Sequence, residues 1–231
     1  MKKLKLIFPI SLFLIFSFTV FAAYFFSKNV TNNVEIGKID LISQSFLYYD
    51  GTASEPQILD INSTNDEYGL SNRVINCYAT EKLGYSDEKS YFELNNLGFQ
   101  FTFSTNIDVY MRIHIEDAWI SHKVYNNGSI VEQYITKGTT EQGQSPFINE
   151  LSDWKFDEDT GYLYYKTKVE DSNENQSFNF KVSDDYFYIP KKSTAFRESI
   201  LVQVSFTVDI IQANRAEVKW GISNIDDFLG K

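Results

Sequence analysis

The most regular pattern in the chain is the alternation of apolar and polar side chains from Ile200 to Ile211. Successive side chains of a β-strand point to opposite faces of the sheet, so this alternation predicts a strand with one buried face and one solvated face. The β-branched residues of this stretch suit a half-buried sheet surface. The apolar even positions are Ile200, Val202, Val204, Phe206, Val208 and Ile210, and the rest of the chain must supply the sheet partners of this strand.

The same period recurs elsewhere, which predicts more strands. Residues Val109–Glu116 alternate in the same way, with a continuation predicted through Trp119–Ile120, and Asn127–Gly128 is a hairpin turn signal before a return strand at Ile130–Ile135. A helical period over three turns is absent from every window, and only residues 150–155 and 193–199 are compatible with a turn or two of helix.

The expected fold class is therefore all-β. Many short strands without βαβ alternation predict a single antiparallel β-sandwich with long loops, such as the polar stretch Thr52–Arg73. The expected domain covers residues 36–222, is closed by Glu217–Trp220, and is followed by a C-terminal tail at residues 223–231.

Composition excludes several classes of partner. The chain has 231 residues, is 43% hydrophobic and 16% aromatic, and carries a formal charge of −10. Such a chain can pack a core, but it has no basic stripe for nucleic acid and is repelled by an anionic membrane surface. A single cysteine, Cys77, cannot form an intrachain disulfide and is expected in or near the core.

The N-terminus is typical of an export signal. Lys2, Lys3 and Lys5 precede the apolar stretch Leu6–Ala22, and cleavage between Ala22 and Ala23 would release a chain that begins at Ala23. Residues 1–22 are therefore predicted to be a signal peptide. The alternative is an uncleaved anchor, because Leu6–Phe26 is uncharged and long enough to span a bilayer. In both cases the domain lies outside the cytoplasm, secreted or at the cell surface.

No catalytic constellation is visible in the sequence, so we expect no catalytic residue, cofactor or metal, and no enzyme activity. His114 and Glu116 are placed on one strand face, but two ligands do not make a metal site, and His122 is expected beyond a strand end. The turn Asp157–Asp159 could bind calcium through its carboxylates, although hydration is the simpler interpretation.

Five segments in order resemble the family of exported Gram-positive proteins processed by a SipW-type signal peptidase, which includes TasA and the camelysins. The resemblance is closest to its BsaA-like biofilm-matrix branch. The matching segments are Ala22–Ser27, Val30–Leu41, Tyr110–Ile113, Gly161–Lys166 with the preceding Trp154, and the closing Ile211–Asn214.

This resemblance implies a jelly-roll-like β-sandwich that is exported, processed by a SipW-type signal peptidase and assembled with itself, head to tail, into extracellular biofilm-matrix fibres alongside other matrix components. The segment 23–35, together with the start of the domain, would be donated as a strand to the next subunit. The side chains that would enter the acceptor are Tyr24, Phe25, Phe26, Val30, Val34 and Ile36.

Two alternatives remain at this stage. One is a monomeric surface protein or adhesin held in the membrane by the uncleaved N-terminal segment, the only part expected to contact the membrane. The other is a peptidase, because camelysin-like relatives are classed as metallopeptidases. The residues disfavour a peptidase, since only His114 and His122 could serve as nitrogen ligands.

Overall fold

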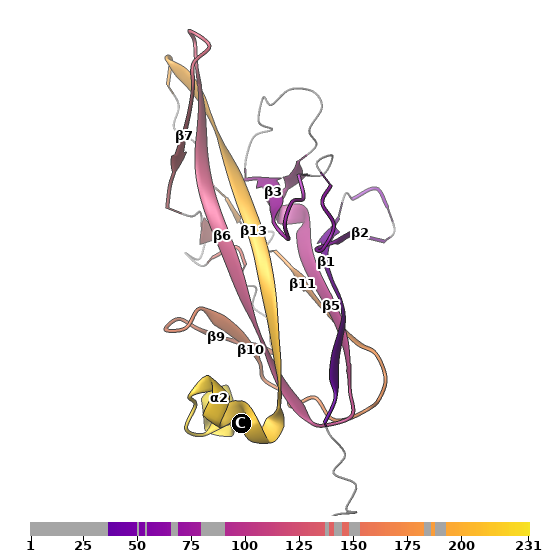
Figure 1. Ribbon diagram of the computed structural model, residues 1–231. Coiled ribbons are helices and arrows are strands. Elements are labelled where there is room, and N and C mark those ends of the chain that lie inside the picture. Colours follow the sequence, from indigo (N-terminus) through magenta and orange to yellow (C-terminus); the bar gives the residue numbers. More distant parts are fainter. Residues whose placement is uncertain are drawn as a thin grey trace, which may run out of the picture. The chain divides into compact units, whose positions relative to one another are not determined.

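Two long antiparallel strands, β6 (Val109–Tyr125) and β13 (Phe196–Gln212), form the centre of the computed structural model. They pair along their whole length, from Val109 opposite Gln212 to Tyr125 opposite Phe196 (Figure 1). The structure describes residues 37–49, 51–53, 55–65, 69–79, 91–136, 139–140, 145–147, 153–182, 186–187 and 193–231. Residues 38–231 form one unit with its own core.

The larger sheet is built on this pair. Its strand order is β4-β3-β13-β6-β10-β9, and β7 pairs with β6 beyond the end of β10. All of these pairs are antiparallel except β3 with β4. The remaining strands are β3 (Ile75–Tyr78), β4 (Phe92–Glu93), β7 (Ile130–Tyr134), β9 (Trp154–Asp157) and β10 (Tyr162–Tyr165).

The second sheet has the order β11-β5-β1-β2, and all its pairs are antiparallel. Its strands are β1 (Ile39–Tyr48), β2 (Gln57–Asp60), β5 (Leu97–Thr105) and β11 (Gln176–Lys181). Two short strands, β8 (Thr139–Thr140) and β12 (Tyr186–Phe187), form a separate pair, and the 3-10 turns η2 (Leu94–Asn96) and η3 (Ala213–Arg215) precede β5 and follow β13.

The two sheets pack face to face, which confirms an all-β sandwich. Phe206 of β13 reaches across to Phe46 of β1 and Phe99 of β5, with ring centroids 5.6 and 5.0 Å apart. The predicted alternation is confirmed, because the even positions from Ile200 to Phe206 are all buried. The strand is longer than the sequence predicted and begins at Phe196.

The predictions about helices were wrong in place. Trp154 and Lys155 belong to β9 and Phe196–Ser199 to β13, while residues 150–152 lie outside the described residues. The closing segment is helix α2 (Ala216–Trp220), followed by helix α3 (Ile225–Leu229) within the expected tail. Gly221 and Gly230 end these helices in the left-handed conformation, which glycine adopts without steric cost. Helices this short escape detection by periodicity.

Arg112 connects helix α2 to the outer face of the larger sheet. Its guanidinium stacks 3.9 Å from the ring centre of Tyr162 and 5.0 Å from that of Trp220. Its Nε donates to Asp209 at 2.9 Å, and the indole N–H of Trp220 donates to the same carboxylate at 3.0 Å. The side chain therefore joins β6, β10, β13 and α2 through charge and ring contacts together.

Removal of the Phe206 ring tests the packing between the sheets. We expect Phe206→Ala to lower the free energy of unfolding by about 3–5 kcal/mol, because a buried ring is lost and the rigid sheets leave a cavity. Urea denaturation measures the loss. Thr207→Ala, on the exposed face of the same strand, is the control and should change stability by less than about 0.5 kcal/mol. Equal losses would contradict this packing.

Replacement of Arg112 tests the attachment of the C-terminal helices. Arg112→Met keeps a long, unbranched side chain but removes the charged hydrogen bonds to Asp209 and Tyr164. We expect a loss of about 2 kcal/mol, the scale of hydrogen bonds that involve a charged group. Exposed Arg215→Met is the matched control. We also expect faster proteolysis of the C-terminus in Arg112→Met alone. Equal free energies of unfolding for the two variants would contradict this attachment.

Candidate functional site: an open sheet edge

The two sheets share one side on which strands lack a neighbour. β13 pairs with β3 only at Leu201–Val204, and β1 pairs with β2 only at Ser45–Tyr48. Within the described residues, no strand pairs with the outer side of Ile39–Ser43 of β1 or of Ser205–Gln212 of β13, and Gln44 is the first residue of β1 whose carbonyl accepts from the segment after β2, from the N–H of Ile61 at 3.1 Å. We call these two half-strands together the open edge.

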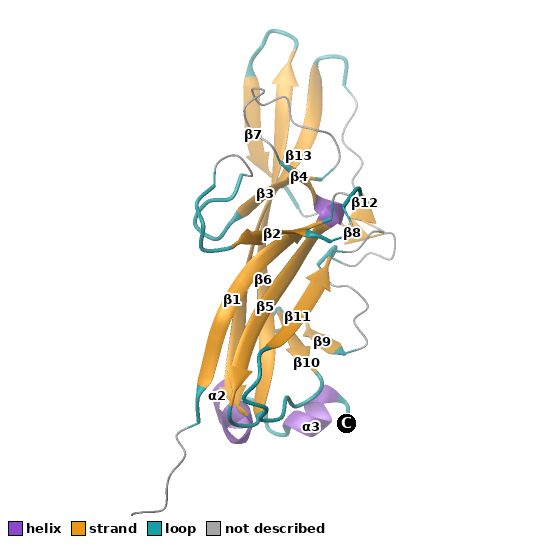
Figure 2. Ribbon diagram, turned by 90° about the vertical axis from the view of Figure 1, so that its right-hand side faces the viewer, coloured by secondary structure: helices purple, strands orange, loops and turns teal. Residues whose placement is uncertain are grey.

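The two half-strands belong to the same side of the sandwich. The ring contact between Phe46 and Phe206 places β1 across from β13. At the opposite side, Trp154 of β9 contacts Phe180 of β11, with ring centroids 4.4 Å apart. Figure 2 shows β1 as the outermost strand of its sheet below β2. The open edge is therefore one feature of the fold and not two unrelated strand ends.

The core is incompletely covered along the open edge. Leu41 lies opposite Phe103, which is fully buried, so the two side chains share the inner face of the sheet. Leu41 nevertheless remains 43% exposed. On the other sheet, Val208 and Ile210 lie opposite the buried residues Ile113 and Met111, yet they are only partly buried. Apolar side chains that point into the sandwich thus retain contact with solvent.

The backbone of β13 also presents hydrogen-bonding groups at the open edge. The carbonyl of Ile200 accepts the N–H of Ala79 in the segment that continues β3, at 3.0 Å. Because the backbone groups of alternate residues point to the same side of a strand, those of Phe206, Val208 and Ile210 point to the side where β3 has ended. An added strand would find both hydrogen-bonding partners and an apolar slot there.

The open edge carries few of the features that discourage strand addition. Proteins protect edges with short strands, lysines, prolines or bulges. A register irregularity does occur in β1 between Leu41 and Ser43, but Ile42 at that position is apolar and 50% exposed. The half-strand of β13 contains neither lysine nor proline. The charged side chains of the open edge are those of Asp40 and Asp209.

The structure does not combine the predicted ligand residues into a metal centre. The Nδ1 atom of His114 lies 3.1 Å from the Gly161 carbonyl oxygen, and its Nε2 atom lies 4.0 Å from Glu116. The expectation that His122 lies beyond a strand end was wrong: it is buried inside β6, with Nδ1 3.1 Å from Glu132. Among the described residues no group of three or more His, Cys, Asp or Glu side chains could hold a metal ion.

Cys77 and the turn Asp157–Asp159 are the remaining positions that the sequence singled out. Cys77 lies in the core of β3, as expected, and burial raises the pKa of its thiol far above the usual range. In the turn Asp157–Asp159, the carboxylate of Asp157 accepts a hydrogen bond from the Thr160 hydroxyl. A buried neutral thiol is inert.

The predicted leader and donor segment lie outside the described residues. This applies to residues 1–22, to the cleavage position Ala22–Ala23, and to Tyr24, Phe25, Phe26, Val30, Val34 and Ile36. In the part of the chain that is described, no helix has the length and apolar character needed to cross a membrane.

Comparisons with known proteins add no family assignment. No protein-family model, no curated protein and no solved structure matches the chain. The open edge is thus argued from the geometry of this chain alone. Alternation in the sequence identified Val208 and Ile210 as inward-facing, but it contained no signal that the strand beside them would end early. The sequence did not identify Leu41 as inward-facing, because the register irregularity between Leu41 and Ser43 interrupts the alternation of β1.

Amide exchange tests the open edge directly. In the monomer we expect the N–H groups of Val208 and Ile210 to exchange with deuterium much faster than those of Thr207 and Asp209, which face β6. Hydrogen bonding in the sheet protects an amide, whereas an unpaired edge leaves it accessible to water. Residue-resolved exchange by NMR measures the difference. Equal protection of all four amides would show that something already covers this edge.

Proposed function

We propose that this chain is an exported subunit of extracellular biofilm-matrix fibres, in which the segment 23–35 of one copy adds as a strand to the open edge of the next. The partner is a second copy of the same chain, joined head to tail, together with other matrix components. A SipW-type signal peptidase would free the segment by cleavage between Ala22 and Ala23. The fold would be the jelly-roll-like form of the sandwich that the family resemblance implies.

The observation that carries the proposal is the exposure of inward-facing apolar side chains at the open edge. Leu41 is 43% exposed although its cross-strand partner Phe103 is fully buried. An added strand would bury such side chains and would satisfy the backbone groups of β13 at the same time. Hydrophobic burial supplies the stabilisation, and backbone hydrogen bonds set the direction of the added strand.

The sequence of the proposed donor suits this slot. Val30, Val34 and Ile36 have the same parity, so in an extended strand they would face one side. That side would meet the apolar positions of β1 and β13 and would also carry Asn32, while Thr31, Asn33 and Glu35 would face water. The segment joins the domain at Lys38, whose N–H donates to the Asn106 side chain at 2.6 Å. This bond fixes the start of β1 at the turn between β5 and β6.

Strand donation of this kind produces an open filament. The donor and the acceptor are different surfaces of the chain, so each added copy leaves one free donor at one end and one free acceptor at the other. Polymer length is then set by concentration and not by closure of a ring. The proposal needs no enzyme activity, cofactor or nucleic acid.

Deletion of the donor tests the proposal. We expect residues 23–231 to form ordered fibres by electron microscopy, whereas residues 36–231 should remain monomeric, because the donor is missing and the fold is intact. Circular dichroism checks that both forms are folded. If the shorter form polymerises as well as the longer one, donation by this segment is wrong. An intact Met1–Ala22 segment in the cell-associated protein, found by mass spectrometry, would favour the anchored-monomer alternative.

A mixing experiment separates donor from acceptor. Val208→Lys in residues 23–231 should block the acceptor with a charge but leave the donor free. Mixed with residues 36–231, which can only accept, it should form dimers and no fibres, as measured by analytical ultracentrifugation. The matched control is Ile58→Lys on β2, where the native side chain is 60% exposed. That variant should polymerise normally, and polymerisation of Val208→Lys alone would place the acceptor elsewhere.

A further inference from the structure

The turn between β6 and β7 lies at one end of the long ladder (Figure 1) and consists of residues 126–129, with the sequence Asn-Asn-Gly-Ser. The N–H of Gly128 donates to the carbonyl of Tyr125, and the N–H of Tyr125 donates to the carbonyl of Ser129, both at 2.9 Å. Gly128 has a φ of +82°, a left-handed conformation that glycine adopts without steric cost. All four turn residues are exposed, so water reaches each of them.

The side chain of Asn127 folds back over the peptide group that follows it. Its Oδ1 atom accepts one hydrogen bond from the N–H of Ser129 at 3.0 Å and a second from the Ser129 hydroxyl at 2.7 Å. Such an Asx-turn puts the side-chain carbonyl in the place that a backbone carbonyl takes in a β-turn. The amide carbon of Asn127, Cγ, is thereby held close to the backbone nitrogen of Gly128, and a bond between these two atoms would close a succinimide ring.

The same two hydrogen bonds point at the oxygen on which negative charge would develop. Attack of the Gly128 nitrogen on Cγ of Asn127 moves electrons of the C=O bond onto Oδ1. Donors that are already aimed at such an oxygen stabilise the tetrahedral state, as they do in an oxyanion hole. Gly128 offers no side chain to obstruct the attack, and no heavy atom other than those of its chain neighbours lies within 4 Å of the position that a Cβ would take.

One interaction of the turn opposes this attack. The Gly128 N–H is engaged by the Tyr125 carbonyl, and the nitrogen must lose this proton before it can attack. The bond belongs to an exposed turn at the end of a hairpin, where local opening costs far less free energy than global unfolding. Loop motions are also fast compared with covalent modification of an amide. The bond therefore slows the attack but does not prevent it.

We infer that Asn127 is a site of spontaneous deamidation in the folded protein. The deprotonated nitrogen of Gly128 forms a bond to Cγ of Asn127, the bond from Cγ to the amide nitrogen breaks, and that nitrogen takes up a proton and leaves as ammonia. Water then adds to one of the two carbonyls of the succinimide and opens the ring. One opening gives aspartate, and the other gives isoaspartate, in which the main chain runs through the side-chain carbon.

The two products change the turn in different ways. Both add one negative charge, but only isoaspartate inserts an extra carbon atom into the main chain between Tyr125 and Ser129. The hydrogen bonds that close the turn cannot keep their geometry around a longer chain. The register of β7, from Ile130 opposite Val124 onward, begins at this turn. We therefore expect isoaspartate to loosen β7 and to leave the pairing of β6 with β13 intact.

Peptide mapping of residues 23–231 by mass spectrometry, after incubation at neutral and at mildly alkaline pH, tests the inference. We expect the mass increase that replacement of NH by oxygen produces to appear at Asn127 first, and faster at the higher pH, because the attacking nitrogen must be deprotonated. Asn62 is the internal reference: it is also exposed and precedes a serine, but its side-chain amide donates to Asp60 and forms no such Asx-turn. Equal rates at the two positions would overturn the inference.

The same chain in concentrated urea shows what the sequence alone does. Conversion of Asn127 in urea, with none in the folded protein, would mean that the fold protects this position and would also overturn the inference. Ser129→Ala removes the hydroxyl donor to Oδ1 and should deamidate several-fold more slowly than the parent when folded, but at the same rate in urea. Ser177→Ala, exposed on β11, is the matched control and should keep the parent rate in both conditions.

Hydrogen exchange separates the effect of charge from that of chain length. In the isoaspartate form the amides of β7 should exchange faster than in the parent, whereas Asn127→Asp, which adds the charge without the extra carbon, should keep the parent's protection. Equal exchange in both forms would overturn the expected loosening of β7. None of these measurements depends on fibre formation, so failure of this inference and failure of strand donation are distinguishable.

Discussion

The antiparallel pairing of β6 with β13 is the interaction on which the rest of the structure depends. Each strand has 17 residues, and the pair provides the central ladder of the larger sheet. Its inner face supplies core residues such as Phe206 and Trp119, and its outer face holds Arg112, which stacks on Trp220 of helix α2. A neighbouring strand would need a similar length to cover one side of this ladder completely.

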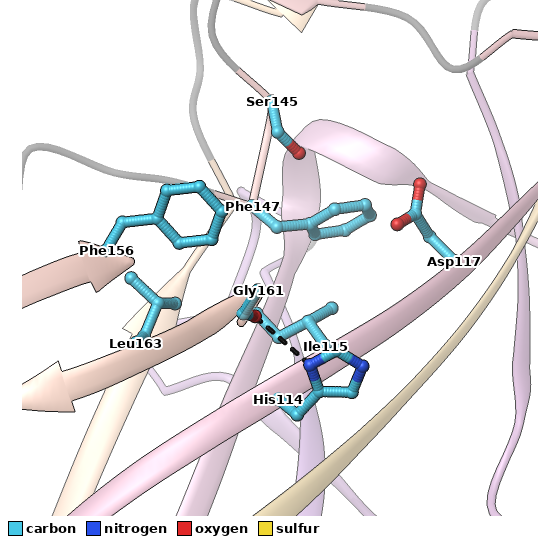
Figure 3. Close-up of a pocket in the computed structure, with 8 residues that line it drawn as sticks. All are labelled: His114, Ile115, Asp117, Ser145, Phe147, Phe156, Gly161 and Leu163. Carbon is cyan, nitrogen blue, oxygen red and sulfur yellow. Dashed lines mark hydrogen bonds between the residues drawn. The ribbon is translucent and has the colours of Figure 1, made fainter. Parts of the chain in front are cut away.

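The neighbouring strands do not match that length, and the mismatch leaves an open edge on one side of the ladder and a small cavity on the other (Figure 3). β3 covers only four residues of β13, so the rest of that side remains open. On the other side of the ladder, β10 and β7 share the edge of β6 but leave a step at Ile115, where the small cavity lies. The fold thus places an apolar slot on one side of the ladder and a small cavity of mixed polar and apolar lining on the other.

Much of the sandwich could be predicted from the sequence, because alternation along Ile200–Ile211 and Val109–Glu116 reports burial directly. The end of a neighbouring strand leaves no such local signal, so the exposure of Leu41 could not be foreseen. The cavity joins Ile115 to Phe156 through the pairing of β9 and β10 with β6, and to Phe147 through a turn, and neither approach has a local sequence signal. Helix α2 has five residues, too few to show a helical period. Gly221, which ends this helix, is a residue type that commonly follows a helix, but a glycine alone does not predict one.

The contrast between the edges of the two sheets gives the open edge its significance. The outermost strands β2, β4, β7, β9 and β11 have between two and six residues, and short edges offer little to an incoming strand. The unpaired half of β13 is longer, and its backbone groups stand beside side chains that already point into the core. A strand that adds there completes an existing core, whereas a strand that adds to β2 would gain backbone bonds alone. The difference in apolar burial would therefore favour the open edge over β2 for any strand that adds to this fold.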